Sequence, residues 1–404
     1  MSLHADQRTS SGTARYRLIN LSLFCAGFIT FVTLYDIQPL LPVFSSEFNV
    51  SPAAGSLPLS ISTFTLAIAM LLLGTASESL GRKPVMATAL AATSILALLT
   101  AFSQGFYSLL ALRFLQGLVL AGVPSVAMAY LAEELEPAAI ASAMGLYISG
   151  NAVGGMCGRV VSAIMSDYMP WRSAIAVIGM VSLLLAIIFA RALPPSACFR
   201  RRPFEYRYLV TSLTQHLRDP GMLLLFGIAF FCMGGFISIY NYIGFRLLDA
   251  PYRLSQSSIS LIFLVYFFGS FCSAIVGRLV SRFGMRLTVR LSIASMLAGT
   301  LLTLDERLPV IVLGVALFTG GFFSCHALAS SWVGRRATSA RAQASSLYLF
   351  FYYLGSSISG TGGGLFWMHS GWPGVAVMIA LLVLCALACA ETMMRRFPLV
   401  PSSP

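Results

Sequence analysis

An acidic side chain lies inside one of the long apolar runs of the sequence, LFCAGFITFVTLYDIQPLLPVF. It is Asp36, and of the 14 acidic residues of the chain it alone falls clearly within a predicted membrane span. An ionisable group in hydrocarbon is costly, so we expect this one to have a function. A carboxyl group there can bind and release a proton. The alternative is a carboxylate that caps the outer end of the span and remains in water.

A basic residue in a later apolar run could balance this acid. Arg113 stands in the run SLLALRFLQGLVLAG, and counting inward from the outer ends of the two spans places it within roughly 3 Å in depth of Asp36. Substrate or water that entered between the two groups would change the energy of the charged carboxylate. The pair could thereby couple proton binding to substrate binding. A static ion pair that fixes two helices together is the alternative interpretation.

Polar and aromatic side chains in this and other apolar runs could bind a small molecule. Aromatic rings with polar tips stack on flat or greasy ligands without demanding one geometry. A histidine among them could relay protons. The alternative is ordinary interior packing together with anchoring at the membrane surface. The candidate substrate-binding residues are Tyr35, Gln38, Asn241, Tyr242, His326 and Tyr352.

The elements that must position these residues are membrane-spanning helices. The chain has 404 residues, of which 57% are hydrophobic and 10% are charged, and its mean hydropathy is +0.83. A soluble domain of this size would not have this composition, and a span needs about 20 apolar residues. We therefore predict an all-α membrane protein with twelve transmembrane helices in two six-helix, pseudo-symmetric halves. The predicted spans are residues 18–44, 57–74, 85–101, 107–131, 138–163, 172–191, 222–247, 256–276, 287–303, 309–332, 343–367 and 373–392.

A short polar run separates the second and third predicted spans. The run GTASESLGRK, from Gly74 to Lys83, leaves about ten residues in which the chain must turn. Gly81 suits a left-handed turn, and the two bases after it anchor the connector on the side where positive charge is retained. A similar run from Gly277 to Arg286 indicates a duplicated half. The candidate gating residues of the two connectors are Gly74, Glu78, Gly81, Arg82, Lys83, Gly277, Arg282, Gly284 and Arg286.

Glycines recur four residues apart in the fifth predicted span. Gly150, Gly154 and Gly158 would lie on one face of a helix. Small residues at this spacing let a neighbouring helix approach closely, so the pattern predicts a packing contact. A polar amide and a base interrupt the same apolar stretch. The residues singled out in this span are Gly150, Asn151, Gly154, Gly155, Gly158 and Arg159.

The net charge of +12 reflects membrane topology rather than a polyanionic partner such as a nucleic acid. Most of the 26 basic residues fall on one side when the N-terminus is inside, so the positive-inside rule places both termini in the cytoplasm. The residues before Tyr16 lack the apolar core and cleavage site of a signal peptide. The predicted domains are a cytoplasmic tail (1–17), an N-terminal bundle (18–191), a cytoplasmic linker (192–221), a C-terminal bundle (222–392) and a second cytoplasmic tail (393–404).

Three of these motifs resemble signatures of the Major Facilitator Superfamily. The first connector resembles the loop signature G-x-x-x-D-R-x-G-R-[RK], with Glu78 in place of Asp and Ser79 in place of Arg. The fourth predicted span resembles R-x-x-Q-G, beginning at Arg113. The fifth resembles the antiporter signature G-x-x-x-G-P-x-x-G-G, with Asn151 in the Pro position and the leading Gly one residue out of register.

Within this superfamily the sequence is similar to the YnfM-type inner-membrane transporters of bacteria, notably in the segments GRKPVM, GLYISGN, NYIGFRL and QASSLYLF. The resemblance implies two homologous halves that rock against each other around a substrate site near the bilayer midplane. It further implies proton-driven antiport that exports small organic compounds, drug-like or sugars, across the bacterial inner membrane. Monomeric action, energy from the proton gradient and the lack of a cofactor are implied by the same resemblance.

Other functions would use these residues differently. Proton-coupled uptake of a small neutral or anionic solute needs the same residues, because the direction of transport depends on coupling that a sequence does not display. A membrane-embedded enzyme, such as an acyl or glycosyl transferase, would need other groups. The sequence contains no H-x-x-x-x-D box, no paired acids within spans and no His cluster, and its cysteines lack metal-ligand spacing. We therefore expect a transporter without a metal site rather than an enzyme.

Overall fold

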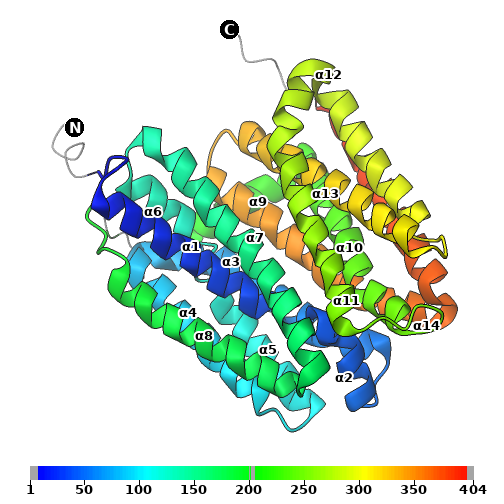
Figure 1. The fold of residues 1–404 in the computed structure, drawn as a ribbon. Coiled ribbons are helices and arrows are strands. Elements are labelled where there is room, and N and C mark those ends of the chain that lie inside the picture. The colour runs from blue at the N-terminus through cyan, green and yellow to red at the C-terminus, as the bar shows by residue number, and fades with distance from the viewer. Residues whose placement is uncertain (1–7, 200, 202–204, 398–404) are drawn as a thin grey trace. The chain divides into compact units, whose positions relative to one another are not determined.

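The computed structural model describes residues 8–199, 201 and 205–397, and most of these residues are helical. The described residues outside the helices contain one isolated β-bridge, between Thr9 and Leu135. Figure 1 shows the course of the chain. The helices are α1 (Ala14–Tyr35), η2 (Gln38–Leu40), α2 (Leu41–Glu47), α3 (Pro52–Leu80), α4 (Arg82–Ala101), α5 (Phe106–Leu120), α6 (Ala127–Glu134), α7 (Pro137–Tyr168), α8 (Trp171–Ala192), α9 (Tyr206–Arg218), α10 (Pro220–Leu248), α11 (Gln256–Ser260), η3 (Leu261–Leu264), α12 (Val265–Leu302), α13 (Leu308–Arg336) and α14 (Arg341–Arg396).

These helices form the twelve predicted spans. In the described part of the chain, 8 helical stretches are long and apolar enough to cross a membrane. Two of them contain two spans each, because α12 breaks at Gly284 and α14 breaks at Ser370 and Gly371. The helix α7 adds another span, and α5 with α6 adds the last. The predicted all-α membrane fold is confirmed.

The first span is broken at its acidic residue. The helix α1 ends at Tyr35, the short helix η2 follows, and α2 continues the span. Pro39 lacks the backbone N–H that would bond to the Tyr35 carbonyl, so a regular α-helix cannot continue there. The last carbonyls of α1 are therefore available to side chains from other helices.

The connector between the second and third spans is shorter than the sequence predicted. Between α3 and α4 a single residue, Gly81, makes the turn with a φ of +99°. The prediction that the connector starts at Gly74 was wrong, because the polar residues from Gly74 to Leu80 belong to α3. The hydroxyls of Ser77 and Ser79 donate to carbonyls one turn earlier in this helix, which satisfies them without a loop. Gly284, with a φ of +79°, makes the corresponding turn within α12.

The polar stretch between the predicted halves also contains a helix. In α9 the side chains of Leu209, Ser212 and His216 are buried, whereas Tyr206 is exposed. A ring nitrogen of His216 lies 3.2 Å from the carbonyl oxygen of Ala340. Part of the expected solvated linker is therefore an amphipathic helix that packs on its own unit.

The chain folds into two compact units, and their boundaries differ from the predicted halves. Unit 1 is Met1–Leu40 with Ile61–Glu205, and unit 2 is Leu41–Ser60 with Tyr206–Pro404. The segment Leu41–Ser60, which joins the first two spans, packs within unit 2. There the Ser357 hydroxyl donates to the Ser60 carbonyl at 2.7 Å. Span lengths alone could not predict that this segment packs in unit 2, because its placement depends on contacts with residues far away in the sequence.

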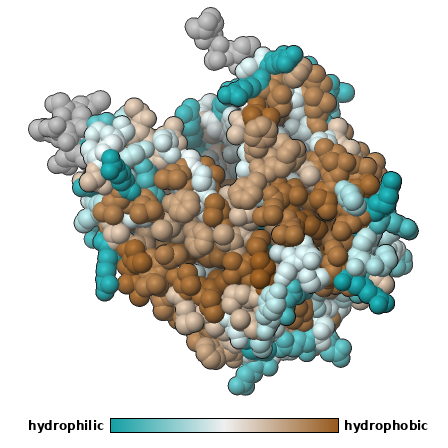
Figure 2. Space-filling view, viewed as in Figure 1, coloured by the Kyte–Doolittle hydropathy of each residue, from teal (hydrophilic) through white to brown (hydrophobic). Residues whose placement is uncertain are grey.

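Large apolar side chains are exposed along the helices of each unit. Leu184 of α8 is 59% exposed, and Phe271 of α12 is 60% exposed. In Figure 2, hydrophobic side chains gather over the lengths of helices, and hydrophilic side chains lie mostly at helix ends. Extended apolar surface of this kind marks contact with a membrane. We conclude that these helix faces contact lipid.

Candidate functional site

Unit 1 contains a buried ion pair at the C-terminal end of α1. The Arg113 Nη1 atom lies 3.5 Å from Asp36 Oδ1, and the two side chains are 1% and 0% exposed. Arg113 belongs to α5, and Asp36 directly follows α1. The fold thus brings together two residues that the sequence analysis had placed at a similar depth in the membrane.

The open carbonyls of α1 hold the Arg113 guanidinium. Its Nη1 donates to the Thr33 carbonyl at 3.0 Å, and its Nη2 donates to the Leu34 carbonyl at 2.8 Å. The C-terminal end of a helix carries a partial negative charge, which favours a cation there. Arg113 therefore has favourable partners whether or not Asp36 is charged.

Two further side chains fix the orientation of this arginine. Arg113 Nε donates to the Ser62 hydroxyl at 3.0 Å, and that hydroxyl donates to the Arg113 carbonyl at 3.0 Å. Gln116 Oε1 accepts from Arg113 Nη1 at 2.6 Å. The R-x-x-Q-G motif pointed to Gln116, but sequence reasoning missed Ser62, because no local pattern distinguishes it from the other serines of α3.

The carboxylate of Asp36 has fewer partners than its arginine. Within the described residues neither of its oxygens accepts a hydrogen bond, and its nearest cationic atom is the one in Arg113 at 3.5 Å. Gain or loss of a proton would therefore change the interactions of Asp36 far more than those of Arg113. A buried charge with one cationic neighbour is sensitive to any movement of that neighbour.

A second buried arginine lies against the segment that follows α1. Arg159 of α7 is 2% exposed, and its Nε donates to Gln38 Oε1 at 2.6 Å. Its Nη1 donates to the Gly155 carbonyl at 2.6 Å, and its guanidinium carbon lies 3.8 Å from the centroid of the Tyr35 ring. Aromatic faces attract cations. Arg159 thus forms one cluster with Tyr35 and Gln38, which the sequence analysis had listed apart from it as substrate-binding candidates.

Close packing of α7 on α1 positions this second arginine. A Cβ atom added at Gly150, Gly154 or Gly158 would lie 2.4, 2.3 or 2.5 Å from a carbonyl oxygen of α1. A Cβ atom at Gly27 of α1 would lie 2.2 Å from Asn151 Oδ1. Only residues without a side chain allow two helices to approach this closely.

The candidate substrate-binding residues of unit 2 lie among its helices. The Tyr242 hydroxyl donates to a backbone carbonyl of α14 at 2.7 Å, and Asn241 is 2% exposed. The His326 Nδ1 atom lies 3.0 Å from the Tyr348 hydroxyl, and the His326 and Tyr352 ring centroids are 4.8 Å apart. The structure thus places Tyr35 and Gln38 in unit 1 and the other four predicted substrate-binding residues in unit 2.

The first connector motif forms an ion network in unit 1. Arg82 Nη2 lies 2.7 Å from Glu133 Oε1 and 4.0 Å from Glu78 Oε1. Lys83 Nζ donates to the Leu193 carbonyl at 2.5 Å. Glu78, the acid of the motif, therefore shares Arg82 with Glu133, which follows the fourth predicted span.

Sequence reasoning missed the two acids at the end of that span, Glu133 and Glu134. Their signal is the run AYLAEELEP, in which adjacent carboxylates directly follow an apolar stretch. Glu134 is fully buried and lies 2.9 Å from Arg15. It also accepts from the backbone N–H groups of Ala197 and Cys198 at 3.0 and 2.9 Å. This carboxylate ties the first turn of α1 and the segment after α8 to the end of α6.

The repeated motif in unit 2 makes different contacts. Arg286 donates to the Met394 carbonyl at 3.2 Å, and Gly277 and Arg282 are exposed on α12. No acidic side chain of the described residues lies within 4.0 Å of Arg282 or Arg286. The two copies of the motif therefore share their turn geometry but not their ion pairs.

Comparison with known proteins identifies the family. The sequence profile of the Major Facilitator Superfamily matches residues 21–251. The chain is 50% identical over 376 residues to the uncharacterized MFS-type transporter YybF of Bacillus subtilis (strain 168), with 93% of each chain covered. It is 45% identical over 391 residues to the inner membrane transport protein YnfM of Escherichia coli (strain K12), which covers 97% of this chain and 94% of that protein.

The fold agrees with this sequence similarity. The crystal structure of the nucleoside transporter NupG superimposes with a TM-score of 0.73 at 15% sequence identity, covering 94% of this chain and 100% of that one. At this identity the match concerns the fold alone. Twelve spans, the repeated connector motif and the sequence matches together show that the chain belongs to the Major Facilitator Superfamily, a family of secondary transporters and not of enzymes.

Proposed function

We propose that this transporter is a proton-coupled antiporter that exports small organic compounds across the bacterial inner membrane by alternating access. It acts as a monomer, takes its energy from the proton gradient and needs no cofactor. Both termini lie in the cytoplasm, and the excess of basic residues in the segments assigned to that side supports this orientation.

The buried pair of Asp36 and Arg113 carries this proposal. A charged Asp36 is stable in a membrane-spanning bundle only while the guanidinium stays 3.5 Å away. When Asp36 binds a proton the ion pair ceases to exist, whereas Arg113 keeps the carbonyls of α1. Protonation thereby changes the attraction between α1 and α5, which is the kind of change that can bias a transporter toward one conformation.

The charge of the cluster favours neutral or anionic compounds. Unit 1 buries two guanidinium groups, Arg113 and Arg159, at the end of the helix that precedes Asp36. Protonation of Asp36 makes this cluster more positive, which disfavours a cation nearby. Tyr35 and Gln38 add an aromatic face and an amide, groups that suit a flat organic molecule.

A cell-based comparison tests the function. Cells that express the wild type, Asp36→Asn or Arg113→Ala are assayed for resistance to, and accumulation of, a panel of neutral, anionic and cationic compounds. We expect the wild type to lower accumulation of at least one compound, and Asp36→Asn to lose about tenfold or more of that effect. The matched control is Asp305→Asn, which removes a half-buried carboxylate 3.0 Å from the exposed Arg307 and should behave as the wild type.

Two outcomes would overturn parts of the proposal. Normal export by Asp36→Asn at every pH would remove the assigned role of this residue. If inverted vesicles of the wild type move a compound in the same direction as the proton, the protein is a symporter, and the export assignment is wrong.

A further inference from the structure

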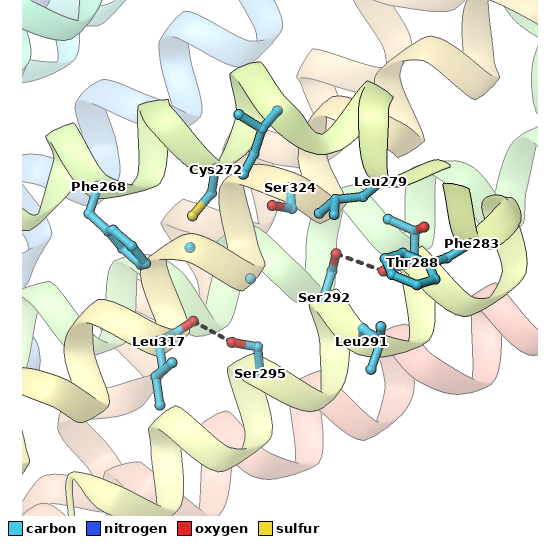
Figure 3. A pocket seen from close by; sticks show the side chains of 13 residues that line it. Phe268, Cys272, Leu279, Phe283, Thr288, Leu291, Ser292, Ser295, Leu317 and Ser324 are labelled. Atoms are coloured by element: carbon cyan, nitrogen blue, oxygen red, sulfur yellow. Dashed lines mark hydrogen bonds between the residues drawn. The ribbon is translucent and has the colours of Figure 1, made fainter. Parts of the chain in front are cut away.

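We propose that unit 2 binds an anionic phospholipid of the surrounding bilayer in a groove between α12 and α13. The groove has a volume of about 200 Å³ and is lined by α12 on both sides of its break and by α13. Figure 3 shows Phe268, Cys272, Leu279 and Phe283 along one wall. Together with Ile275, which also lines the groove, these residues recur at three- and four-residue spacing, so they form one stripe of the helix.

The groove walls present mostly hydrocarbon, because three of the four hydroxyl groups that line the groove already donate to backbone carbonyls. The Thr288 hydroxyl donates to the Gly284 carbonyl at 2.9 Å, and the Ser292 hydroxyl donates to the Thr288 carbonyl at 2.9 Å. The Ser295 hydroxyl donates to the Leu317 carbonyl at 2.8 Å (Figure 3). A ligand in this groove would gain little from hydrogen bonding and much from apolar contact. An acyl chain fits that requirement.

Positive charge lies at the end of the groove where α12 breaks. The Arg282 guanidinium carbon lies 5.2 Å from the centroid of the Phe283 ring, and that ring lines the groove. Arg278 is exposed one turn earlier on α12. Neither arginine has an acidic partner within 4.0 Å among the described residues. Guanidinium groups bind phosphate through paired hydrogen bonds, so these two can hold the headgroup.

The apolar groove walls and the two arginines together favour an anionic phospholipid as the ligand. A lipid without a phosphate would fill the groove but leave the arginines without an anion, and a zwitterionic phospholipid would bring a cationic group next to them together with its phosphate. A free phosphate would meet the arginines but leave the apolar walls exposed. Leu291, which lines the groove, is 54% exposed, and Phe271 of α12 is 60% exposed; large apolar residues with this exposure are the kind that face lipid. An anionic phospholipid satisfies both parts, with one acyl chain between α12 and α13 and its phosphate at Arg282.

Lipid titration tests the headgroup contact. The full chain in neutral detergent is titrated with phosphatidylglycerol or phosphatidylcholine, and bound lipid is counted by native mass spectrometry. We expect tighter binding of phosphatidylglycerol, and a loss of about fivefold for each of Arg278→Ala and Arg282→Ala. Arg335→Ala, which removes an exposed arginine outside the groove at the end of α13, should bind as the wild type. Equal binding of the two lipids, or an equal loss in Arg335→Ala, would overturn the proposal.

Photocrosslinking tests the acyl-chain contact. Phosphatidylglycerol with a diazirine on its acyl chain should label peptides that contain residues 268–283 and 317–324. Cys272→Phe, which places a ring in the groove, should lower this labelling while transport activity reports that the variant is folded. Labelling spread evenly over the exposed helices, or binding of glycerol phosphate as tight as that of the lipid, would contradict a groove site. Crosslinks between two chains at these peptides would assign the groove to a second copy instead.

Discussion

At the residue scale, the surroundings of Arg113 explain how a charged pair can be stable inside a helical membrane bundle. The guanidinium binds the carbonyls of Thr33 and Leu34 in the last turn of α1, and Gln116 Nε2 also donates to the Thr33 carbonyl at 3.4 Å. Among the described residues, Arg113 alone places a cationic atom within 4.0 Å of the Asp36 carboxylate. The arginine therefore stabilises both a helix end and an acid.

Removal of Arg113 should be costly for this reason. We predict that Arg113→Ala lowers the free energy of unfolding by about 3–5 kcal/mol, because it leaves a buried carboxylate without a counter-charge. Adding Asp36→Asn to this variant should restore part of the loss. Chemical unfolding in mixed micelles measures both values. Equal stability of the single and double variants would show that Asp36 does not depend on Arg113.

A second residue-scale prediction concerns pH and lies outside the spans. Burial of Asp219 raises its pKa, but hydrogen bonds from Arg336 and from the backbone N–H groups of Gly221 and Met222 outweigh this effect, so the pKa lies below its usual value of 3.8. Asp219 therefore stabilises the fold above pH 3.8, and this contribution is lost as the pH falls below that value.

The matching variant is Asp219→Asn. It should lower stability at pH 7 by about 1 kcal/mol, because Asp219 also caps the N-terminus of α10. The difference from the wild type should shrink as the pH falls below 3.8, as measured by thermal unfolding in detergent. A stability difference between the two proteins that stays constant as the pH falls below 3.8 would show that the charge of Asp219 does not stabilise the fold.

At the element scale, glycines decide how the helices approach and where they turn. The four-residue spacing in the fifth span was sufficient to predict a close contact, and the partner proves to be α1. The spacing could not name that partner, because it depends on which helices neighbour each other in the folded chain. The same limit applies to Ser62, whose contact with Arg113 exists only after α3 and α5 pack together.

Packing of α7 on α1 gives a prediction with an internal control. Gly154→Ala would place a Cβ atom 2.3 Å from the Phe28 carbonyl, so the helices must separate. We expect a loss of about 1–3 kcal/mol in stability together with reduced transport. Gly145→Ala, in the same helix with no atom within 4 Å of the new Cβ, should not lose stability. Similar behaviour of the two variants would contradict the packing model.

Turn geometry gives the second element-scale prediction. Gly81 adopts a φ of +99° and Gly284 a φ of +79°, so Ala at either position should cost about 1–3 kcal/mol. Gly277→Ala should be tolerated, because nothing lies within 4 Å of the new Cβ atom. Unfolding of the purified variants compares them directly. Equal effects at Gly277 and Gly284 would show that the motif glycines are not distinguished by backbone conformation.

At the scale of the whole molecule, the sequence was sufficient for the number of spans but not for the limits of the units. Apolar runs and charged ends are local properties, so they revealed twelve helices even where α12 and α14 continue through a break. The assignment of Leu41–Ser60 to unit 2 depends on contacts such as that between Ser357 and Ser60, which are distant in sequence. The buried Glu134 escaped notice because the fourth span was predicted to end before it.

Coupling of transport to protons is likewise a property of the whole molecule, and one comparison tests it most directly. Wild type and Asp36→Asn are reconstituted in proteoliposomes with a compound found in the cell-based screen. Counterflow, in which labelled compound exchanges for unlabelled compound, is then compared with transport driven by an imposed pH gradient. We predict that Asp36→Asn retains counterflow and loses gradient-driven transport. Gradient-driven transport at the wild-type rate in Asp36→Asn would contradict the assignment of the proton to this carboxyl group.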